Sequence, residues 1–202
     1  MKKISTKEKI LLAALDLFSE KGYEEASIDL IAETVGIKGP SIYAHYAGKE
    51  DILNFLITMM EQRYDENFGN SSNLERIPDS LEEFKEDCLR RVKFTMEDTQ
   101  IQKVRRFCTK EQYRNEKIAV LMTKHQLTGN QEMYALMLEK MMGKNLIRKM
   151  DAELLALELV APVVVLLEMA DREPDRKEEA WKQIDAHLSH FICVYGKETD
   201  VR

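Results

Sequence analysis

The chain has 202 residues, of which 44% are hydrophobic and 33% charged, with only eight glycines and four prolines. This composition predicts an all-helical globular protein, and three widely spaced cysteines argue against a disulfide framework and for a cytoplasmic location. A secreted or membrane protein is not expected, because the N-terminus has no signal-like apolar run and the densest apolar segment, residues 154–167, is shorter than the roughly 20 residues that cross a bilayer.

The first two predicted helices have clear ends. Apolar residues recur at helical spacing over about residues 5–21, and Gly22 ends this pattern as a C-terminal cap. Ser27 then opens a second helix by accepting a hydrogen bond from a free backbone N–H. Gly36 ends that helix, because glycine adopts the left-handed conformation easily.

The next segment, residues 35–46 with the sequence VGIKGPSIYAHY, combines a turn with polar and aromatic side chains. Pro40 has no N–H to leave unsatisfied at a helix start, so a short third helix is predicted from residue 39 or 40 to 45. Ile42 is expected to face inward and to hold this helix to the one before it. The residues expected to face outward are Lys38, Pro40, Ser41, Ala44 and His45.

The rest of the chain reads as a series of longer helices. A fourth helix is predicted over residues 49–68, and the small polar segment 69–73 is the clearest linker candidate. No strand pattern competes further on. The helices expected there cover about residues 78–97, 99–112, 116–143, 151–171 and 175–196.

A long helix, a two-turn helix, a glycine turn and a short helix together form a helix-turn-helix, whose second helix enters the major groove of DNA. A Gly-Pro turn alone is also ordinary packing, so the whole arrangement carries the prediction. The net charge of −6 does not oppose it. Lysines cluster at the N-terminus and on both sides of residues 35–46, and the distribution of charge, rather than its total, makes a binding footprint.

From Ile10 to about Leu56 the sequence resembles the N-terminal domain of TetR-type transcriptional regulators. The resemblance implies a DNA-binding domain, a variable helical ligand domain and a homodimer. We therefore assign residues 1–48 to DNA binding and residues 49–202 to effector binding and dimerisation, with the helix over 49–68 connecting the two. The matching residues occur in order and without gaps: Ala14, Phe18, Gly22, Tyr23, Ser27, Ile31, Ala32, Val35, Gly36, Ile37, Ile42, Tyr43, His45, Tyr46, Lys49 and Glu50.

The resemblance also implies roles for single residues. Ser27 matches a residue that caps the second helix and touches phosphate, and Tyr43 and Lys49 match further phosphate contacts. Gly39 and Pro40 offer no long polar side chain, so sequence preference is expected to depend on Lys38, on Ser41 and on DNA shape. The predicted DNA-binding set is Ser27, Lys38, Gly39, Pro40, Ser41, Tyr43, Ala44, His45, Tyr46 and Lys49.

Two departures from the family pattern lie close together. Tyr46 stands where phenylalanine is commoner, which we expect to be harmless. Gly48 replaces the serine that often caps the fourth helix, and because a glycine cap costs little, only local rigidity is affected.

The last two predicted helices carry the expected dimer interface. Residues 154–167 are apolar nearly all round, and pairing with a symmetry mate as a four-helix bundle would bury them, as TetR-like proteins do. The alternative is that both helices form the core of a monomer. The predicted interface residues are Leu155, Leu159, Val163, Leu166, Trp181, Ile184, Leu188, Ile192 and Tyr195.

No family motif covers residues 70–202, so the effector site is placed by the resemblance alone, among the helices from 78 to 171. A lining rich in methionine and aromatic residues suits an apolar or multi-ring molecule. Each candidate is alternatively an ordinary core residue. The candidates are Phe94, Phe107, Met122, His125, Tyr134, Met137 and Met141.

Metal and catalytic sites are not expected. His187, His190 and Cys193 follow each other at three-residue spacing, but a fourth metal ligand is not evident. No glycine-rich phosphate loop or nucleophile elbow occurs, so we expect no cofactor and no enzyme.

These features predict a cytoplasmic repressor that binds a palindromic double-stranded DNA operator as a homodimer. A small, apolar effector is expected to release it from the DNA, and no membrane is involved. The alternative is a TetR-like DNA-binding protein without a small-molecule effector, controlled by a protein partner. A second alternative is that the chain is an enzyme, in which case the helix-turn-helix would be vestigial.

Overall fold

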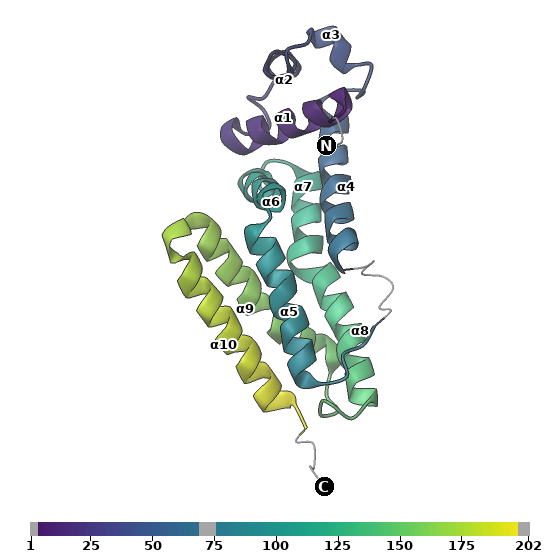
Figure 1. Ribbon diagram of the computed structural model, residues 1–202, viewed down its shortest axis with the longest axis vertical. Coiled ribbons are helices and arrows are strands. Elements are labelled where there is room, and N and C mark those ends of the chain that lie inside the picture. The colour runs from purple at the N-terminus through teal and green to yellow at the C-terminus, as the bar shows by residue number, and fades with distance from the viewer. Residues whose placement is uncertain (1–3, 69–75, 198–202) are drawn as a thin grey trace. The chain divides into compact units, whose positions relative to one another are not determined.

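The computed structural model describes residues 4–68 and 76–197, and within these ranges helices joined by turns and short loops make up the fold (Figure 1). The predicted all-α class is confirmed. One isolated antiparallel bridge, between Ile147 and Gly196, is the nearest approach to strand pairing in the described ranges. Across the same residues, no helix combines the length with the apolarity that a bilayer crossing requires. The linker predicted at residues 69–73 lies outside the described residues.

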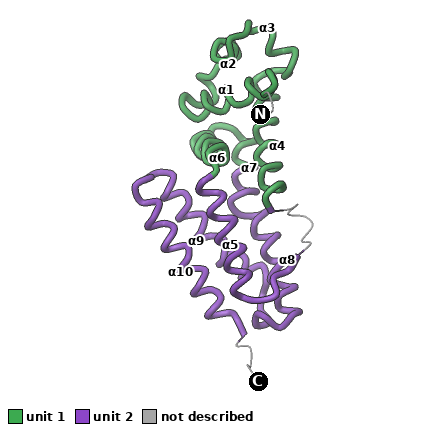
Figure 2. Tube along the Cα trace, in the orientation of Figure 1, with its two compact units in different colours: residues 1–67, 98–119 green, residues 68–97, 120–202 purple. Residues whose placement is uncertain are grey.

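Contacts divide the chain into two compact units (Figure 2). Unit 1 contains residues 1–67 and 98–119, and unit 2 contains residues 68–97 and 120–202. The division at residue 48 that the sequence suggested concerns function and stays a prediction. By contacts, the fourth helix and residues 98–119 pack with the first three helices.

Unit 1 is built around α1, which contacts both α2 and α6. Ser5 caps the start of α1 by accepting from the Glu8 N–H, and Ser27 caps α2 by accepting from the Leu30 N–H, as its sequence position predicted. The largest fully buried side chains of this unit include Phe18, which stacks on Phe107 of α6. The helices are α1 (Thr6–Lys21), α2 (Ile28–Val35), α3 (Gly39–Ile42), α4 (Lys49–Phe68), α6 (Thr99–Glu111) and α7 (Glu116–Thr123), of which α4 and α7 each end in unit 2.

Unit 2 packs α9 against both α8 and α10, and α10 against α5. Its core gathers around Phe84 and contains several methionines, which are unbranched and fill irregular spaces. The helices are α5 (Leu81–Glu97), η1 (Lys124–Thr128), α8 (Gly129–Gly143), α9 (Ala152–Arg172), η2 (Pro174–Arg176) and α10 (Lys177–Tyr195).

The single helix predicted over residues 116–143 is interrupted. Residues Lys124–Thr128 form a π-helical turn, η1, between α7 and α8. The Asn130 side chain donates to the His125 carbonyl and so occupies an acceptor that a regular helix would use. Such a local exchange of partners is not visible in hydrophobic periodicity.

The predicted dimer interface is wrong for four of its residues. Leu155, Leu159, Ile184 and Leu188 are buried in the core of unit 2 within one chain, so they are not available to a second copy. Helix α9 is apolar on more than one side, and the sequence pattern did not show whether the apolar stripe of α10 faces its own chain or a second copy. The remaining predicted residues are partly buried against the same core: Val163, Leu166, Trp181, Ile192 and Tyr195.

Several predicted pocket residues also belong to hydrophobic cores. Phe107 is buried in unit 1 against Phe18, so its assignment to an effector pocket in the second domain is wrong. Met137 and Met141 are buried in the core of unit 2. Burial raises the pKa of Tyr134, which is hydrogen-bonded to Cys88. The pocket roles of the other candidates stay predictions: Phe94, Met122, His125 and Tyr134.

Candidate nucleic-acid interface

The turn between α2 and α3 depends on Gly36. Its φ of 78° lies in the left-handed region, where a residue with a Cβ is strained. From there the Gly36 N–H donates to the Glu33 carbonyl and the Ile37 N–H donates to the Ala32 carbonyl, both at 3.0 Å. These bonds satisfy the free carbonyls at the end of α2 and turn the chain toward α3.

Helix α3 is shorter than predicted, because its regular part ends at Ile42. The His45 and Tyr46 N–H groups both donate to the Ile42 carbonyl, at 2.9 and 3.0 Å, so residues 43–45 form a turn. The Ile42 side chain is fully buried and anchors the segment to unit 1. A segment this short would not hold its shape without that anchor, since isolated short helices are unstable in water.

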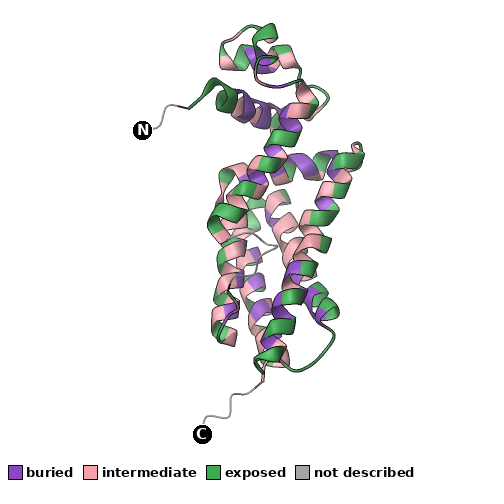
Figure 3. Cartoon of the chain, turned by 90° about the vertical axis from the view of Figure 1, so that its right-hand side faces the viewer, coloured by how far each residue is buried: buried purple, intermediate pink, exposed green. Residues whose placement is uncertain are grey.

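Around this anchor the predicted outward-facing residues are on the surface. Tyr43 has 61% of its surface exposed, which is unusual for so large a side chain, while Gly39 and His45 are partly covered. In Figure 3 the ribbon at this end of unit 1 is coloured as exposed and partly buried residues around a few buried ones. The members of the predicted set in the exposed class are Ser27, Lys38, Pro40, Ser41, Tyr43 and Ala44.

Gly39 lies beside the side chain of Asp29. A Cβ built on this residue would overlap the Asp29 carboxylate, so a larger residue here would displace that exposed side chain. Asp29 was expected only to favour the start of α2. It also places an exposed carboxylate beside the start of α3, where it would repel a phosphate group.

The structure contradicts the predicted DNA-binding role of Tyr46. Only 2% of the residue is exposed, and its hydroxyl donates to the Lys7 carbonyl at 2.9 Å. The Lys7 ammonium lies 3.9 Å from the Phe55 ring centroid and 5.3 Å from that of Tyr46, so the rings hold this lysine at the surface by cation–π contacts. The sequence placed Lys7 in a basic cluster but gave no sign of its aromatic partners.

Lys49 is largely engaged within unit 1. Its ammonium donates to the Tyr23 carbonyl at 2.6 Å and to the Glu24 carbonyl at 3.4 Å, and it lies 4.3 Å from the Tyr23 ring centroid. An ammonium group has three donors, so one remains for a phosphate oxygen. The phosphate contact stays a prediction, but Lys49 also holds the start of α4 to the turn after α1.

The helical trio of possible metal ligands does not gather. In the part of the chain that the structure describes, no group of three or more His, Cys, Asp and Glu residues is suited to a metal ion. His187 instead places its Nε2 3.1 Å from the Leu159 carbonyl oxygen.

Replacing Tyr46 by phenylalanine should affect stability in a pH-dependent way. The change removes the hydrogen bond to Lys7 and should lower the free energy of unfolding by about 1 kcal/mol. Burial, with Asp51 and Glu8 nearby, raises the pKa of Tyr46 from 10.0 to about 12. Its contribution is therefore complete below pH 10 and is lost as the pH rises from about 10 to 12, because the unfolded chain ionises first.

Urea unfolding of the wild type and Tyr46→Phe between pH 7 and 12 checks this expectation. The advantage of the wild type should shrink above pH 10 and reverse before pH 12, because a pKa raised to about 12 disfavours the ionised folded form by more than the hydrogen bond contributes. Tyr43→Phe is the matched control and should change neither stability nor its pH dependence, because its hydroxyl is at the surface. An equal loss in both variants would contradict the burial of Tyr46.

Comparison with known proteins gives the segment a family. Residues 10–55 match the family described as bacterial regulatory proteins, tetR family. The biofilm operon icaADBC HTH-type negative transcriptional regulator IcaR of Staphylococcus epidermidis is 39% identical over 71 residues, which are 31% of this chain and 38% of IcaR. IcaR of Staphylococcus aureus is 48% identical over 46 residues, 23% of this chain and 25% of that protein. The matched segment thus spans well under half the length of these relatives.

Solved structures extend the likeness over both units. SmeT, the repressor of the Stenotrophomonas maltophilia multidrug efflux pump SmeDEF, superposes with a TM-score of 0.74 at 18% identity, over 96% of this chain and 92% of SmeT. The complex of SmeT with triclosan gives a TM-score of 0.77 at 19% identity, over the same shares of the chains. At these identities the likeness establishes the fold. The N-terminal segment, residues 10–55, therefore belongs with the tetR family of bacterial regulatory proteins, and the chain shares its helical fold with SmeT.

Proposed function

We propose that the chain is a transcriptional repressor that binds a palindromic DNA operator as a homodimer and is released by a small, apolar molecule. The observation that carries the DNA-binding part is the pairing of a fully buried Ile42 with exposed Lys38, Ser41 and Tyr43 around it. A rigidly anchored segment with polar side chains facing solvent suits insertion into the major groove.

The exposed residues divide into two kinds of DNA contact. Ser27 and Tyr43 carry hydroxyl groups that can donate to phosphate oxygens, which fixes the position of the protein on the duplex. Lys38 and Ser41 lie at the start of α3, where side chains reach base edges. Lys38 can donate to guanine, and Ser41 can both donate and accept, so these two residues are proposed to select the sequence.

Homodimer formation is proposed through the outer sides of α9 and α10. At about 100° per residue, Leu154, Leu157 and Val165 lie on one stripe of α9, opposite the buried stripe that contains Leu155 and Leu159. All three are exposed, and Val165 has 60% of its surface in solvent. Apolar side chains exposed in a row favour a protein partner, and a second copy covers them by two-fold pairing.

The corresponding stripe of α10 consists of side chains that are mostly small and that include one polar residue. Ala186, His190 and Cys193 are exposed on the side opposite the buried Ile184 and Leu188. Small side chains let two helices approach closely, so this stripe can complete a four-helix interface with the apolar stripe of α9. The proposal replaces the four core residues of the predicted interface with their outward-facing neighbours.

Dimerisation would supply the switching mechanism. Two α3 segments related by a two-fold axis read a palindrome only if they lie about 34–36 Å apart, one turn of B-DNA. An effector releases DNA if it binds more tightly to a conformation with another spacing. The methionine-rich core of unit 2 and the SmeT–triclosan complex support an apolar effector. A protein that acts on genomic DNA would work in the cytoplasm.

Three hydroxyl deletions test the DNA contacts. Tyr43→Phe should weaken binding to every duplex by a similar factor of about 3 to 10, because a phosphate contact carries no sequence information. Ser41→Ala should instead change the ranking of duplexes selected from a random library. Tyr46→Phe should change neither the affinity for DNA nor the ranking of the selected duplexes. Fluorescence anisotropy at fixed salt measures the affinities, and a uniform loss in all three variants would refute this division.

A charged substitution on the outer side of α9 tests the dimer. Val165→Glu should convert the dimer to a monomer, because burying a carboxylate in an apolar interface without a partner is costly. Leu136→Glu, on α8 and also exposed, is the matched control and should stay dimeric. Light scattering gives the mass. A dimeric Val165→Glu protein would place the interface elsewhere.

Triclosan serves as the probe for the effector site. At a concentration 100-fold above its dissociation constant, a ligand stabilises the folded state by about 2.7 kcal/mol, so thermal unfolding should shift upward. Operator-bound protein should dissociate over the same concentration range. Failure of a panel of apolar multi-ring compounds to shift unfolding would favour the alternative, control by a protein partner.

A further inference from the structure

In the turn between α1 and α2, contacts from several helices converge on Tyr23. Its N–H donates to the Glu111 Oε1 at 3.3 Å, and its carbonyl accepts from the Lys49 ammonium at 2.6 Å. Its ring lies 5.2 Å from the Phe18 ring and 6.4 Å from the Phe107 ring, between centroids. The backbone and the side chain of Tyr23 are thus fixed by contacts from α1, α4 and α6.

Glu111 is unusual among these partners. It is the last residue of α6 and has only 5% of its surface exposed, and in the described part of the chain it is the one charged or polar residue in the buried class. Burying a carboxylate is costly unless hydrogen bonds compensate. The backbone N–H of Tyr23, 88 residues away in the sequence, provides one.

The turn is shaped to receive this carboxylate. Gly22 has a φ of 91°, in the region that disfavours side chains, and a Cβ built on it would lie 3.0 Å from the Glu111 Oε1. Glycine at this position therefore serves two ends, since it allows the turn and leaves room for the carboxylate. Next to it, the Lys110 ammonium donates to the Ser19 carbonyl at 3.0 Å, in the last turn of α1.

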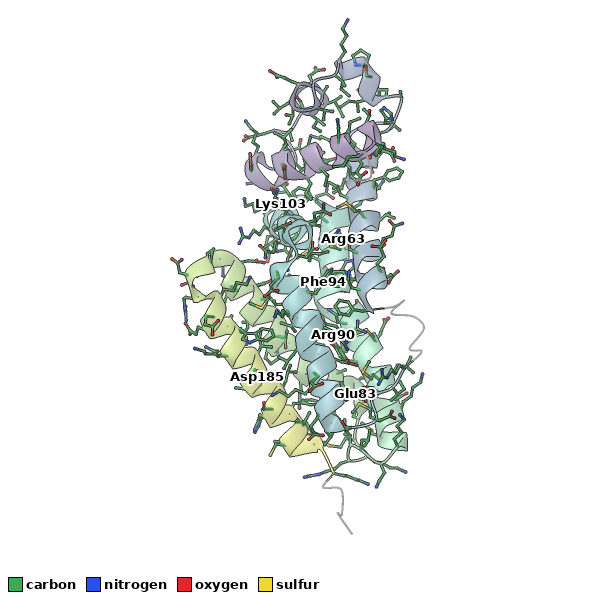
Figure 4. All side chains as sticks on the ribbon, viewed as in Figure 1. Arg63, Glu83, Arg90, Phe94, Lys103 and Asp185 are labelled. Atoms are coloured by element: carbon green, nitrogen blue, oxygen red, sulfur yellow. The ribbon has the colours of Figure 1, made fainter. Side chains whose placement is uncertain are left out.

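Helix α6 is itself fixed within unit 1. Lys103 forms an ion pair with Asp16 of α1, and Arg63 of α4 forms one with Asp98, the residue that caps the start of α6 (Figure 4). Although partial burial opposes it, hydrogen bonds from Arg63 and from the Ile101 and Gln100 N–H groups hold the pKa of Asp98 below its ordinary value. The start, middle and end of α6 are therefore tied to α4, α1 and the turn after α1.

From this geometry we propose that Glu111 is a positioning residue for the DNA-binding segment. Its carboxylate fixes the turn at Tyr23, the turn leads within four residues to the Ser27 cap, and α2 packs against α3. The side chain is distant in sequence from α3 and need not touch DNA. This inference rests on the proposed DNA-binding function and adds a residue of α6 that sets how α3 is presented.

The test uses the full-length chain and three variants. Glu111→Met keeps much of the volume but removes both oxygens, whereas Glu111→Gln keeps an acceptor for the Tyr23 N–H. Val104→Ala is the control, because Val104 is buried on α6 and its truncation destabilises the same helix without touching the turn. Amide hydrogen exchange at Tyr23 and affinity for a duplex selected by the wild type are measured at a temperature where every variant is folded.

Glu111→Met should lose the protection of the Tyr23 amide and bind the duplex about tenfold more weakly. Glu111→Gln should restore most of both properties. Val104→Ala should lower the unfolding temperature while keeping the Tyr23 protection and the affinity of the wild type. This combination of results would show that Glu111 positions the turn, rather than only adding to the stability of the fold.

Two results would overturn the inference. The first is a Glu111→Met protein with normal Tyr23 protection and normal affinity, and the second is a Val104→Ala protein that loses affinity to the same extent. A wild type that selects no duplex from a random library would refute the proposed function itself. The exchange of the Tyr23 amide would then still decide whether Glu111 holds the turn, so the two failures are distinguishable.

Discussion

The burial of Ile42 is the constraint on which the candidate DNA-binding surface depends. Four residues cannot maintain a helix in water, so α3 exists because one side chain is removed from solvent, which contributes about 1.5–3 kcal/mol. With Ile42 fixed, the geometry of the short helix places Lys38, Ser41 and Tyr43 in solvent. The polar surface is thus a consequence of the apolar anchor beneath it.

Backbone turns, and hydrogen bonds to backbone groups, also hold the candidate DNA-binding surface of unit 1 in place. Gly36 and Gly22 adopt left-handed φ values that turn the chain twice in a short distance. Side chains from distant segments then take up the exposed backbone groups: Lys49 and Glu111 bind the two sides of Tyr23, and the Tyr46 hydroxyl binds Lys7. A surface that must fit a rigid duplex benefits from such supports, because loosely held residues pay an ordering cost on binding.

In unit 2, helix α9 has apolar residues on two sides, one buried in the core and one exposed to solvent. The inner sides of α9 and α10 fill the core around Phe84, and the outer side of α9 leaves Leu154, Leu157 and Val165 in solvent. A helix can bury one apolar side and expose another only if it is apolar nearly all round. The same property made the amphipathic pattern of residues 154–167 uninformative about which residues form the core.

The sequence by itself determined the all-helical class, the caps at Ser27, Gly22 and Gly36, most helix ends to within a few residues, and the exposure around Ile42. These features depend on neighbours within one or two turns, so local pattern is enough. Only the tertiary structure decided that Tyr46 is buried while Tyr43 is exposed, that Leu155 and Ile184 face inward, and that Glu111 meets Tyr23. Those outcomes depend on side chains brought together from distant parts of the chain, and neither residue type nor spacing encodes which of two similar positions will be covered.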